Sequence, residues 1–205
     1  SSAFDPSSAV WVGERAVLDV AGVARTYSNT NGLTQGEVLA GGSIKLDGKG
    51  AYVLTQAGSS INVSGAAPVN LDVPNEAGGL GRSVGSDAGT LTVETSEQAL
   101  LDGAVSAHAG GADNRGGALN VAVIGSTADE RKAAQAPVNT GVLSLAPGGM
   151  AQATGLAPGD AIPLAVLNGA PSTPKTQLNM HAMEAAGFDT MKLKSPTIRL
   201  EDGLN

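Results

Sequence analysis

Short runs of alternating apolar and polar residues recur along the chain, and each run is bounded by Gly, Ser, Asn or Asp. Alternation with a period of two is typical of a β-strand that buries one face. Nine runs of this kind predict an all-β fold and exclude an α/β fold. They cover residues 17–22, 42–48, 52–55, 60–65, 89–94, 99–103, 117–123, 190–194 and 197–201.

Some of these runs repeat as imperfect pairs. Residues 42–46 followed by 52–54 resemble residues 89–93 followed by 99–101, at an offset of 47 residues. Residues 18–22 resemble residues 61–65 at an offset of 43. Such repeats are typical of solenoids, in which each unit buries its apolar face against the next unit. Because the strands are short and the corners are rich in Gly, Asn, Asp and Ser, the pattern predicts a parallel β-helix.

Aromatic side chains are scarce, and this scarcity agrees with a narrow core. The 205 residues contain 29 Gly, no Cys and five aromatic residues. In a β-helix the inward side chains of successive coils lie about 4.8 Å apart, so aliphatic side chains stack easily and rings fit rarely. The aromatic residues are Phe4, Trp11, Tyr27, Tyr52 and Phe188.

Charge, hydropathy and cysteine content exclude several classes of partner and site. The net charge of −7 argues against nucleic acid or anionic lipid as the main partner, because both bind positive surfaces. No apolar stretch approaches the 18 or more residues of a membrane span, so we expect no membrane insertion. The absence of Cys excludes disulfides, thiol nucleophiles and Cys-ligated metals.

Two segments interrupt the strand pattern and are interpreted as insertions in one domain of residues 1–205. Residues 66–86 and about 125–176 are too long and too rich in Pro for ordinary corners. Short helices are predicted at residues 129–135 and 181–186, and the second ends before Gly187. The first residues contain no secretion signal and the last follow a strand-like run, so the chain is interpreted as a fragment of a longer one.

Several phrases, in this order, carry a family resemblance. They are Gly13-Glu-Arg-Ala-Val-Leu-Asp-Val-Ala-Gly22, Gly41-Gly-Ser-Ile-Lys-Leu46, Thr55-Gln-Ala-Gly-Ser-Ser-Ile-Asn-Val-Ser-Gly65, Gly78-Gly-Leu-Gly81, Leu100-Leu-Asp-Gly103 and Ala186-Gly-Phe-Asp189. Across most of residues 10–203 the chain resembles the filamentous haemagglutinin family of bacterial two-partner-secretion exoproteins. The amino-terminal secretion domain of that family, with its Asn-Pro-Asn signatures, is not present.

The resemblance implies a right-handed parallel β-helix from the rod body of a large adhesin, secreted or held at the cell surface. Its function would be structural and adhesive, in attachment to cells, matrix or biofilm. The implied partners are an unidentified receptor or glycan on a host or bacterial cell and, during secretion, an outer-membrane translocator. The lack of Cys fits this route, because periplasmic disulfides would obstruct threading through a pore. No catalytic residue, cofactor or metal is expected.

Two alternatives remain open. A polysaccharide-processing β-helix enzyme requires two carboxyls held about 5 to 9.5 Å apart, here beside an aromatic platform such as Trp11 or Tyr52. The sequence argues against this alternative, because the candidate carboxyls each precede a Gly and are explained as corners. A self-assembling module would instead leave coil ends uncovered. The corner carboxyls are Asp47, Asp102 and Asp202, and Tyr27 is the third candidate platform.

Other motifs have simple structural explanations. His181 and Glu184 have the i, i+3 spacing of two metal ligands on a helix, but a site needs at least three, and His108 is distant in sequence. The loop at residues 110–117 offers oxygen donors without the period of a calcium-binding β-roll. Residues 79–85 miss the nucleotide-binding glycine pattern by one residue. Asn62 opens a glycosylation sequon, which we interpret as a chance match in a Ser-rich chain.

Overall fold

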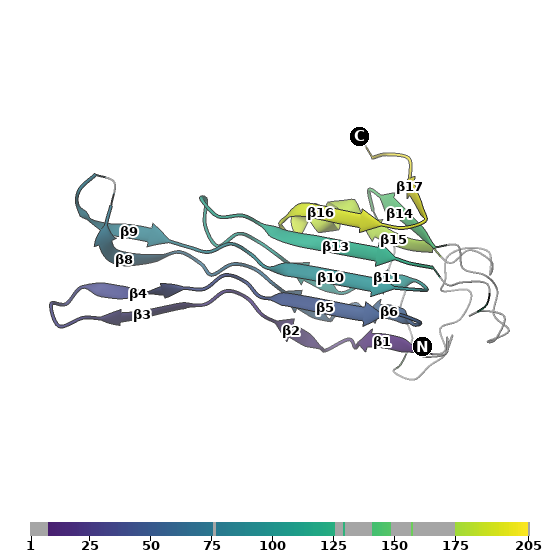
Figure 1. Ribbon diagram of the computed structural model, residues 1–205, viewed down its shortest axis with the longest axis horizontal. Helices are drawn as coiled ribbons and strands as arrows, with labels where there is room; N and C mark the ends of the chain where they lie inside the picture. The colour runs from purple at the N-terminus through teal and green to yellow at the C-terminus, as the bar shows by residue number, and fades with distance from the viewer. Residues whose placement is uncertain are drawn as a thin grey trace.

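The structure of the chain is dominated by β-strands (Figure 1). The computed structural model describes residues 8–75, 77–125, 129, 141–148, 157 and 175–204. The all-β prediction is confirmed, and each of the nine predicted runs contains a strand. Within the described part of the chain, no helix is long and apolar enough to cross a bilayer.

Three parallel sheets form most of the fold. The chain visits them in the same order three times, so strands that are distant in sequence become neighbours. The first sheet has the order β1 (Ala9–Val12), β6 (Tyr52–Thr55) and β11 (Ala99–Leu101). The second has the order β2 (Val17–Asp19), β7 (Ser60–Asn62) and β12 (Ala104–Ser106). The third has the order β5 (Ser43–Gly48), β10 (Thr90–Thr95), β13 (Gly117–Val123) and β16 (Phe188–Lys194).

The register of these sheets agrees with the sequence repeats. Ile44 pairs with Leu91, at the predicted offset of 47 residues. Leu18 pairs with Ile61, at the predicted offset of 43. The second half of the longer repeat differs by one position, because Ala99 pairs with Val53 rather than with the preceding residue. Four residues separate the paired positions Gly48 and Val53, whereas three separate their partners Thr95 and Ala99, and this difference accounts for the shift.

A fourth parallel sheet corrects one predicted boundary. It has the order β15 (Lys175–Asn179), β14 (Val142–Ala146) and β17 (Thr197–Leu200). Residues 125–176 are therefore not one continuous insertion. Leu143 is fully buried in β14, and burial on both faces explains why this strand is a short apolar run without alternation. Next to it, the Thr176 hydroxyl of β15 accepts a hydrogen bond from Ala99 N, which links this sheet to β11.

Two antiparallel hairpins extend from the same side of the parallel sheets (Figure 1). The predicted insertion at 66–86 contains the hairpin of β8 (Val69–Pro74) and β9 (Leu80–Val84). The hairpin of β3 (Ala24–Ser28) and β4 (Thr34–Val38) was not predicted. The two lie against each other, and Thr34 N donates to Asp72 Oδ2 at 2.7 Å.

The tips of the two hairpins have the same hydrogen-bond pattern. Asn29 Oδ1 accepts hydrogen bonds from the backbone N–H groups two and four residues later, and Asn75 Oδ1 does the same in the second hairpin. Gly32 and Gly78 follow three residues after each Asn with φ of 75° and 80°, a region that favours glycine. Because the two tips are 46 residues apart, the hairpins belong to the repeat.

The apolar core is mainly aliphatic, as the scarcity of aromatic side chains predicts, and a few polar side chains such as Glu97 and Gln98 are also buried. Inward residues of the third sheet stack in rows, and one row contains Ile44, Leu91, Leu119 and Met191. Such rows bury apolar area at roughly 25 cal/mol per Å². The fully buried side chains of the sheets include Val53, Leu54, Val93, Leu100 and Val121.

One helix is described, α2 (Met180–Ala185), and it confirms the helix predicted at 181–186. Asn179 caps its start by accepting a hydrogen bond from Ala182 N. Gly187, with φ of 88°, ends it as predicted. The helix predicted at 129–135 lies outside the described residues, apart from position 129.

The corner at the base of the hairpins requires close backbone approach. Gly89 N donates to Val63 O at 2.7 Å, and Thr90 N donates to Gly42 O at 3.0 Å. A Cβ added to Gly89 would overlap the carbonyl oxygen of Gly42. The nearest atoms are all backbone atoms of Gly41 and Gly42, so no flexible side chain can move away.

Gly89→Ala is therefore expected to destabilise the fold by about 2–4 kcal/mol, because it separates the strands and breaks ladder hydrogen bonds. Gly148→Ala is the matched control, since a Cβ there would enter open space. Urea unfolding followed by circular dichroism measures both. Equal midpoints for the two variants would show that close approach at Gly89 is not required.

Candidate functional site

The outer face of the third sheet carries the most organised set of polar side chains. Alternation along each strand directs one set of residues outward, and parallel pairing aligns these residues into rows across the sheet. One row contains Lys45, Thr92, Asn120 and Lys192. The neighbouring row contains Asp47, Glu94, Ala122 and Lys194.

Four residues on β5, β10 and the corner after β5 form what we call the charge cluster: Lys45, Asp47, Lys49 and Glu94. Lys45 Nζ lies 2.9 Å from Glu94 Oε2 and 3.3 Å from Asp47 Oδ2. Lys49 Nζ lies 3.3 Å from Glu94 Oε2 and 3.9 Å from Asp47 Oδ2. Asp47 and Glu94 face each other directly across the strands. The pairing of β5 with β10 thus places two like charges opposite each other, and the two lysines offset their repulsion.

The cluster shifts the pKa values of its members. The side-chain hydrogen bond from Lys45 lowers the pKa of Glu94 below its usual value of 4.5, and Lys49 adds to this effect. Desolvation raises the pKa of Asp47, but hydrogen bonds from Lys45 and the Lys49 backbone, together with both charges, lower it overall. The hydrogen bonds to Glu94 and Asp47 raise the pKa of Lys45 above 10.5.

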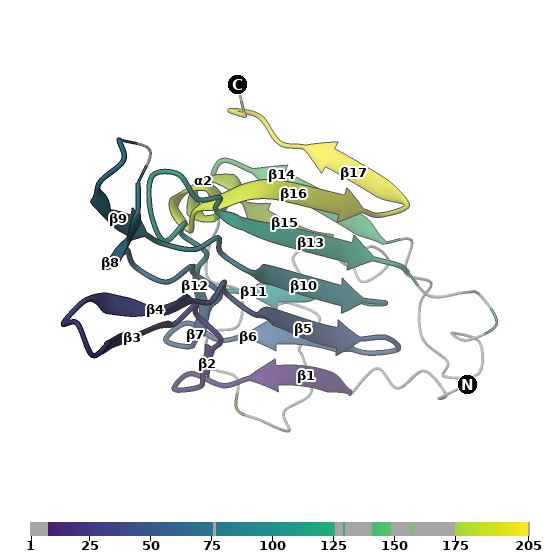
Figure 2. The same ribbon diagram turned by 60° about the vertical axis from the view of Figure 1, so that its left-hand side comes forward.

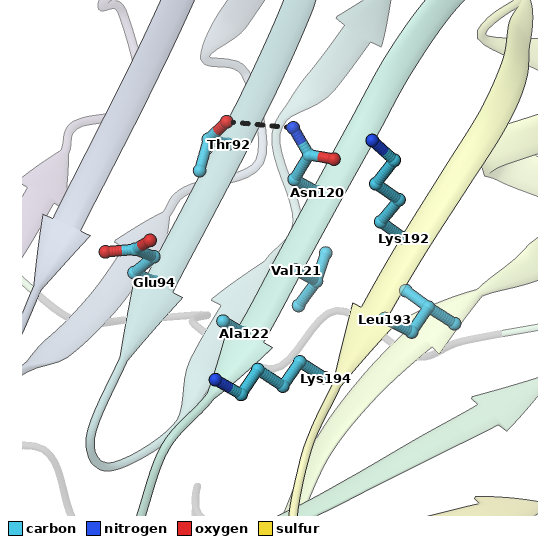
Figure 3. A pocket seen from close by; sticks show the side chains of 8 residues that line it. All are labelled: Thr92, Glu94, Asn120, Val121, Ala122, Lys192, Leu193 and Lys194. Carbon is cyan, nitrogen blue, oxygen red and sulfur yellow. Dashed lines mark hydrogen bonds between the residues drawn. The ribbon is translucent and has the colours of Figure 1, made fainter.

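A shallow hollow lies beside the charge cluster (Figure 3). Its volume is about 240 Å³, below the range of roughly 300–1,000 Å³ typical of small-molecule pockets. Asn120 Nδ2 donates to Thr92 Oγ1 at 3.3 Å across it. The lining residues are Thr92, Glu94, Asn120, Val121, Ala122, Lys192, Leu193 and Lys194.

Lys192 and Lys194, which we call the edge lysines, differ from the lysines of the charge cluster. Both are exposed on β16, and the residues opposite them on β13 are Asn120 and Ala122. Among the described residues, no ion pair includes either edge lysine. Within the part of the chain that the structure describes, this end of the face therefore carries positive charge without an ion-pair partner, although the net charge of the chain is −7.

The corner carboxylates behave only partly as predicted. Asp102 follows β11, and Asp202 lies in the final turn before Gly203. Asp47 instead lies within β5, one residue before its end, and the turn follows at Lys49 and Gly50. Its Oδ1 accepts from Lys49 N at 3.3 Å, so Asp47 supports the turn and also belongs to the charge cluster. A corner role alone is therefore an incomplete account of Asp47.

The aromatic residues considered as sugar platforms and the paired carboxylates lie on different sheets. Trp11 and Tyr52 lie on β1 and β6, in the first sheet, whereas Asp47 and Glu94 lie in the third. Trp11 Nε1 donates to Gln56 Oε1 at 3.1 Å, and Tyr52 is buried. Tyr27 is exposed on β3 of the first hairpin.

The candidate metal ligands remain separate. His181 and Glu184 are exposed on the six-residue helix α2, and His108 is exposed beside Gly187. No group of three or more His, Asp or Glu suited to a metal ion occurs among the described residues. In the loop at 110–117, the nearby carboxylates of Asp87 and Asp189 accept hydrogen bonds from the loop's own backbone.

The two remaining motifs lie in strands. Residues 80–84 of the glycine-rich segment form β9, so this segment does not open a helix. Asn62 ends β7, is half-buried, and accepts a hydrogen bond from Ser64 N at 3.1 Å through its Oδ1. This local bond gives Asn62 a structural role, while its glycosylation stays a prediction.

Sequence reasoning missed the outer face of the third sheet. The signal was present in the repeat, because an offset of 47 residues places Lys45 over Thr92 and Asp47 over Glu94. Lys192 and Lys194 have the same alternate spacing in a later run. Aligning the polar positions as well as the apolar ones would have identified these rows.

Comparison with known proteins found no matching family model, no matching curated protein and no matching solved structure.

The charge cluster should make stability depend on pH in the acid range. Because the folded pKa values of Glu94 and Asp47 are lowered, their contribution is fully present above the usual values of 4.5 and 3.8 and is lost as pH falls through the lowered values. Urea midpoints should therefore fall for the wild type below about pH 4.5. Glu94→Gln should show a smaller fall, so the two proteins converge towards pH 3.

Glu184→Gln is the control for this experiment, because Glu184 is an exposed carboxylate on α2, outside the charge cluster. We expect it to follow the wild type at every pH. If Glu94→Gln also follows the wild type, the charge cluster does not contribute to stability.

Proposed function

We propose that the chain is a segment of a right-handed parallel β-helix with a structural and adhesive function in a secreted or surface-held bacterial exoprotein. The observation that carries the proposal is the threefold passage through the same three parallel sheets. Most corresponding strands of the three passes pair at offsets of 43 to 47 residues, which is the length of one coil with its hairpin in this interpretation. β10 and β13 pair at the shorter offset of 28 residues. The resemblance to filamentous haemagglutinins supplies the biological setting.

Parallel stacking suits a rod. Each strand of a coil hydrogen-bonds to the coils before and after it, so backbone polar groups are satisfied along the axis without a wide core. The repeated hairpins extend from one corner, and no described strand or helix covers the outer face of the third sheet (Figure 2). A rigid scaffold with an open polar face and regular protrusions is suited to contacting other surfaces.

We propose a non-catalytic role. The one pair of carboxylates opposed on the described sheets, Asp47 and Glu94, is bridged by two lysines. Lowered pKa values keep both carboxyls ionised, whereas glycoside hydrolysis needs one protonated acid. For this non-catalytic, adhesive role, the proposed partners are a receptor or glycan on a host or bacterial cell and, during secretion, an outer-membrane translocator.

Self-association is the second candidate function, and the edge strands favour it. Among the described residues, β1, β2 and β5 each pair on one side only and form the same end of the three sheets. Such edges can pair with another chain. Light scattering over a concentration series tests this alternative, and a constant monomer mass would contradict it.

The adhesive proposal predicts that particles coated with the chain attach to cells. Fluorescent beads carrying the wild-type protein should bind cultured epithelial cells or a bacterial biofilm several-fold more than albumin-coated beads. Beads carrying Gly89→Ala, which is expected to disturb the strand stacking, test whether attachment needs the fold. Attachment no greater than that of albumin on all surfaces tested would contradict the adhesive part of the proposal.

A further inference from the structure

Strand β16 is an edge of the third sheet. It pairs with β13 on one side, and no described strand pairs with its other side. The third sheet ends at β16, whereas the fourth sheet, which a hydrogen bond from Ala99 N to Thr176 Oγ1 links to the first sheet, continues past β15 with β14 and β17 (Figure 2). An unpaired edge of a parallel sheet can accept an additional extended strand.

The side chains of β16 indicate what that strand should carry. On the outer face, Lys192 and Lys194 meet Asn120 and Ala122 on β13, whereas Lys45 on β5 meets carboxylates. On the inner face, Met191 and Leu193 are half-buried at the margin of the core. A strand added to β16 would complete both faces with acidic residues outside and aliphatic residues inside.

We propose that β16 binds an extended partner peptide in which acidic and aliphatic residues alternate. The peptide adds a strand to the third sheet, and two of its carboxylates pair with the edge lysines. Residues i and i+2 of a strand share a face, so the spacing of Lys192 and Lys194 matches that of alternate acidic residues. This proposal deepens the adhesive function, because it names the chemistry of one partner.

A second copy of the chain fits this edge less well. If β5 of another copy continued the third sheet in the same register, Lys45 would lie opposite Lys192 and Asp47 opposite Lys194. The first pair is repulsive, and like charges directly opposite each other destabilise a sheet. A polyanion without a strand backbone would satisfy the lysines but would leave the edge of β16 unpaired.

Fluorescence anisotropy of labelled synthetic peptides tests the proposal on the full chain. The probe is a seven-residue peptide with Glu at alternate positions and Val between them. One comparison peptide has Pro in place of the internal Val residues, which removes backbone donors but keeps every charge. A second has Lys in place of Glu. We expect only the Glu–Val peptide to bind the wild type.

Variants of the chain locate the site. Lys192→Ala combined with Lys194→Ala should weaken binding about tenfold or more, because two charge-assisted contacts are lost. Arg25→Ala combined with Arg82→Ala is the matched control, since it removes the same charge from exposed hairpin positions. Lys192→Glu combined with Lys194→Glu should abolish binding of the Glu–Val peptide and create binding of the Lys–Val peptide.

Several results would overturn the proposal. These are the absence of binding to the wild type, equal weakening by the arginine control, failure of the charge reversal to exchange peptide preference, or equal binding of the proline peptide. Heparin would compete with the peptide whether β16 binds an added strand or the edge lysines bind any anion. The proline peptide distinguishes these two cases, because it keeps the charges but cannot pair as a strand. Loss of peptide binding with bead attachment intact would reject this inference alone and leave the adhesive function standing.

Discussion

Parallel strands stacked in register are the constraint on which the rest of the structure depends, although the strands that pair are at least 28 residues apart in sequence in the three main sheets. The backbone satisfies its hydrogen bonds between successive passes of the chain rather than within a local element. Each side chain then lies above a side chain of the same orientation one pass earlier. Residues that are aligned across the sheet consequently share one character, and the row from Ile44 to Met191 is wholly apolar.

The same register sets the electrostatics of the outer face. Asp47 and Glu94 are placed opposite each other by the pairing of their strands, and two lysines from the first pass compensate the repulsion. Farther along the same face, β13 contributes Asn120 and Ala122, so the lysines of β16 lack opposite carboxylates. Compensation at one end and excess charge at the other make the β16 edge the part of this face best suited to an acidic partner.

Much of the fold follows from the sequence, because an alternating strand with one buried face has a recognisable period. All nine such runs contain strands, and the repeat offsets predict the pairing of Leu18 with Ile61 and of Ile44 with Leu91. Two of the strands that were missed, β3 and β14, lack this period. β14 is short and almost wholly apolar, and the residues of β3 are mostly exposed, so neither has a buried and an exposed face in alternation.

The candidate site was harder to predict, because it depends on which strands become neighbours. Lys45 and Glu94 are 49 positions apart, and only the pairing of β5 with β10 brings them to 2.9 Å. The first hairpin had a local signal in Asn29 and Gly32, which recurs at Asn75 and Gly78. That signal identifies a turn and gives no information on where the hairpin packs.

Engineered disulfides test the stacking most directly, because the chain has no cysteine of its own. Ser43 and Thr90 face each other across β5 and β10 on the outer face. Neighbouring strands lie about 4.8 Å apart, within the Cα separation that a disulfide accepts. Ser43→Cys with Thr90→Cys should cross-link on mild oxidation, as measured by mass spectrometry after proteolysis. Ser43→Cys with Glu94→Cys, four residues out of register, should not. Equal cross-linking of both pairs, or of neither, would contradict the in-register stack.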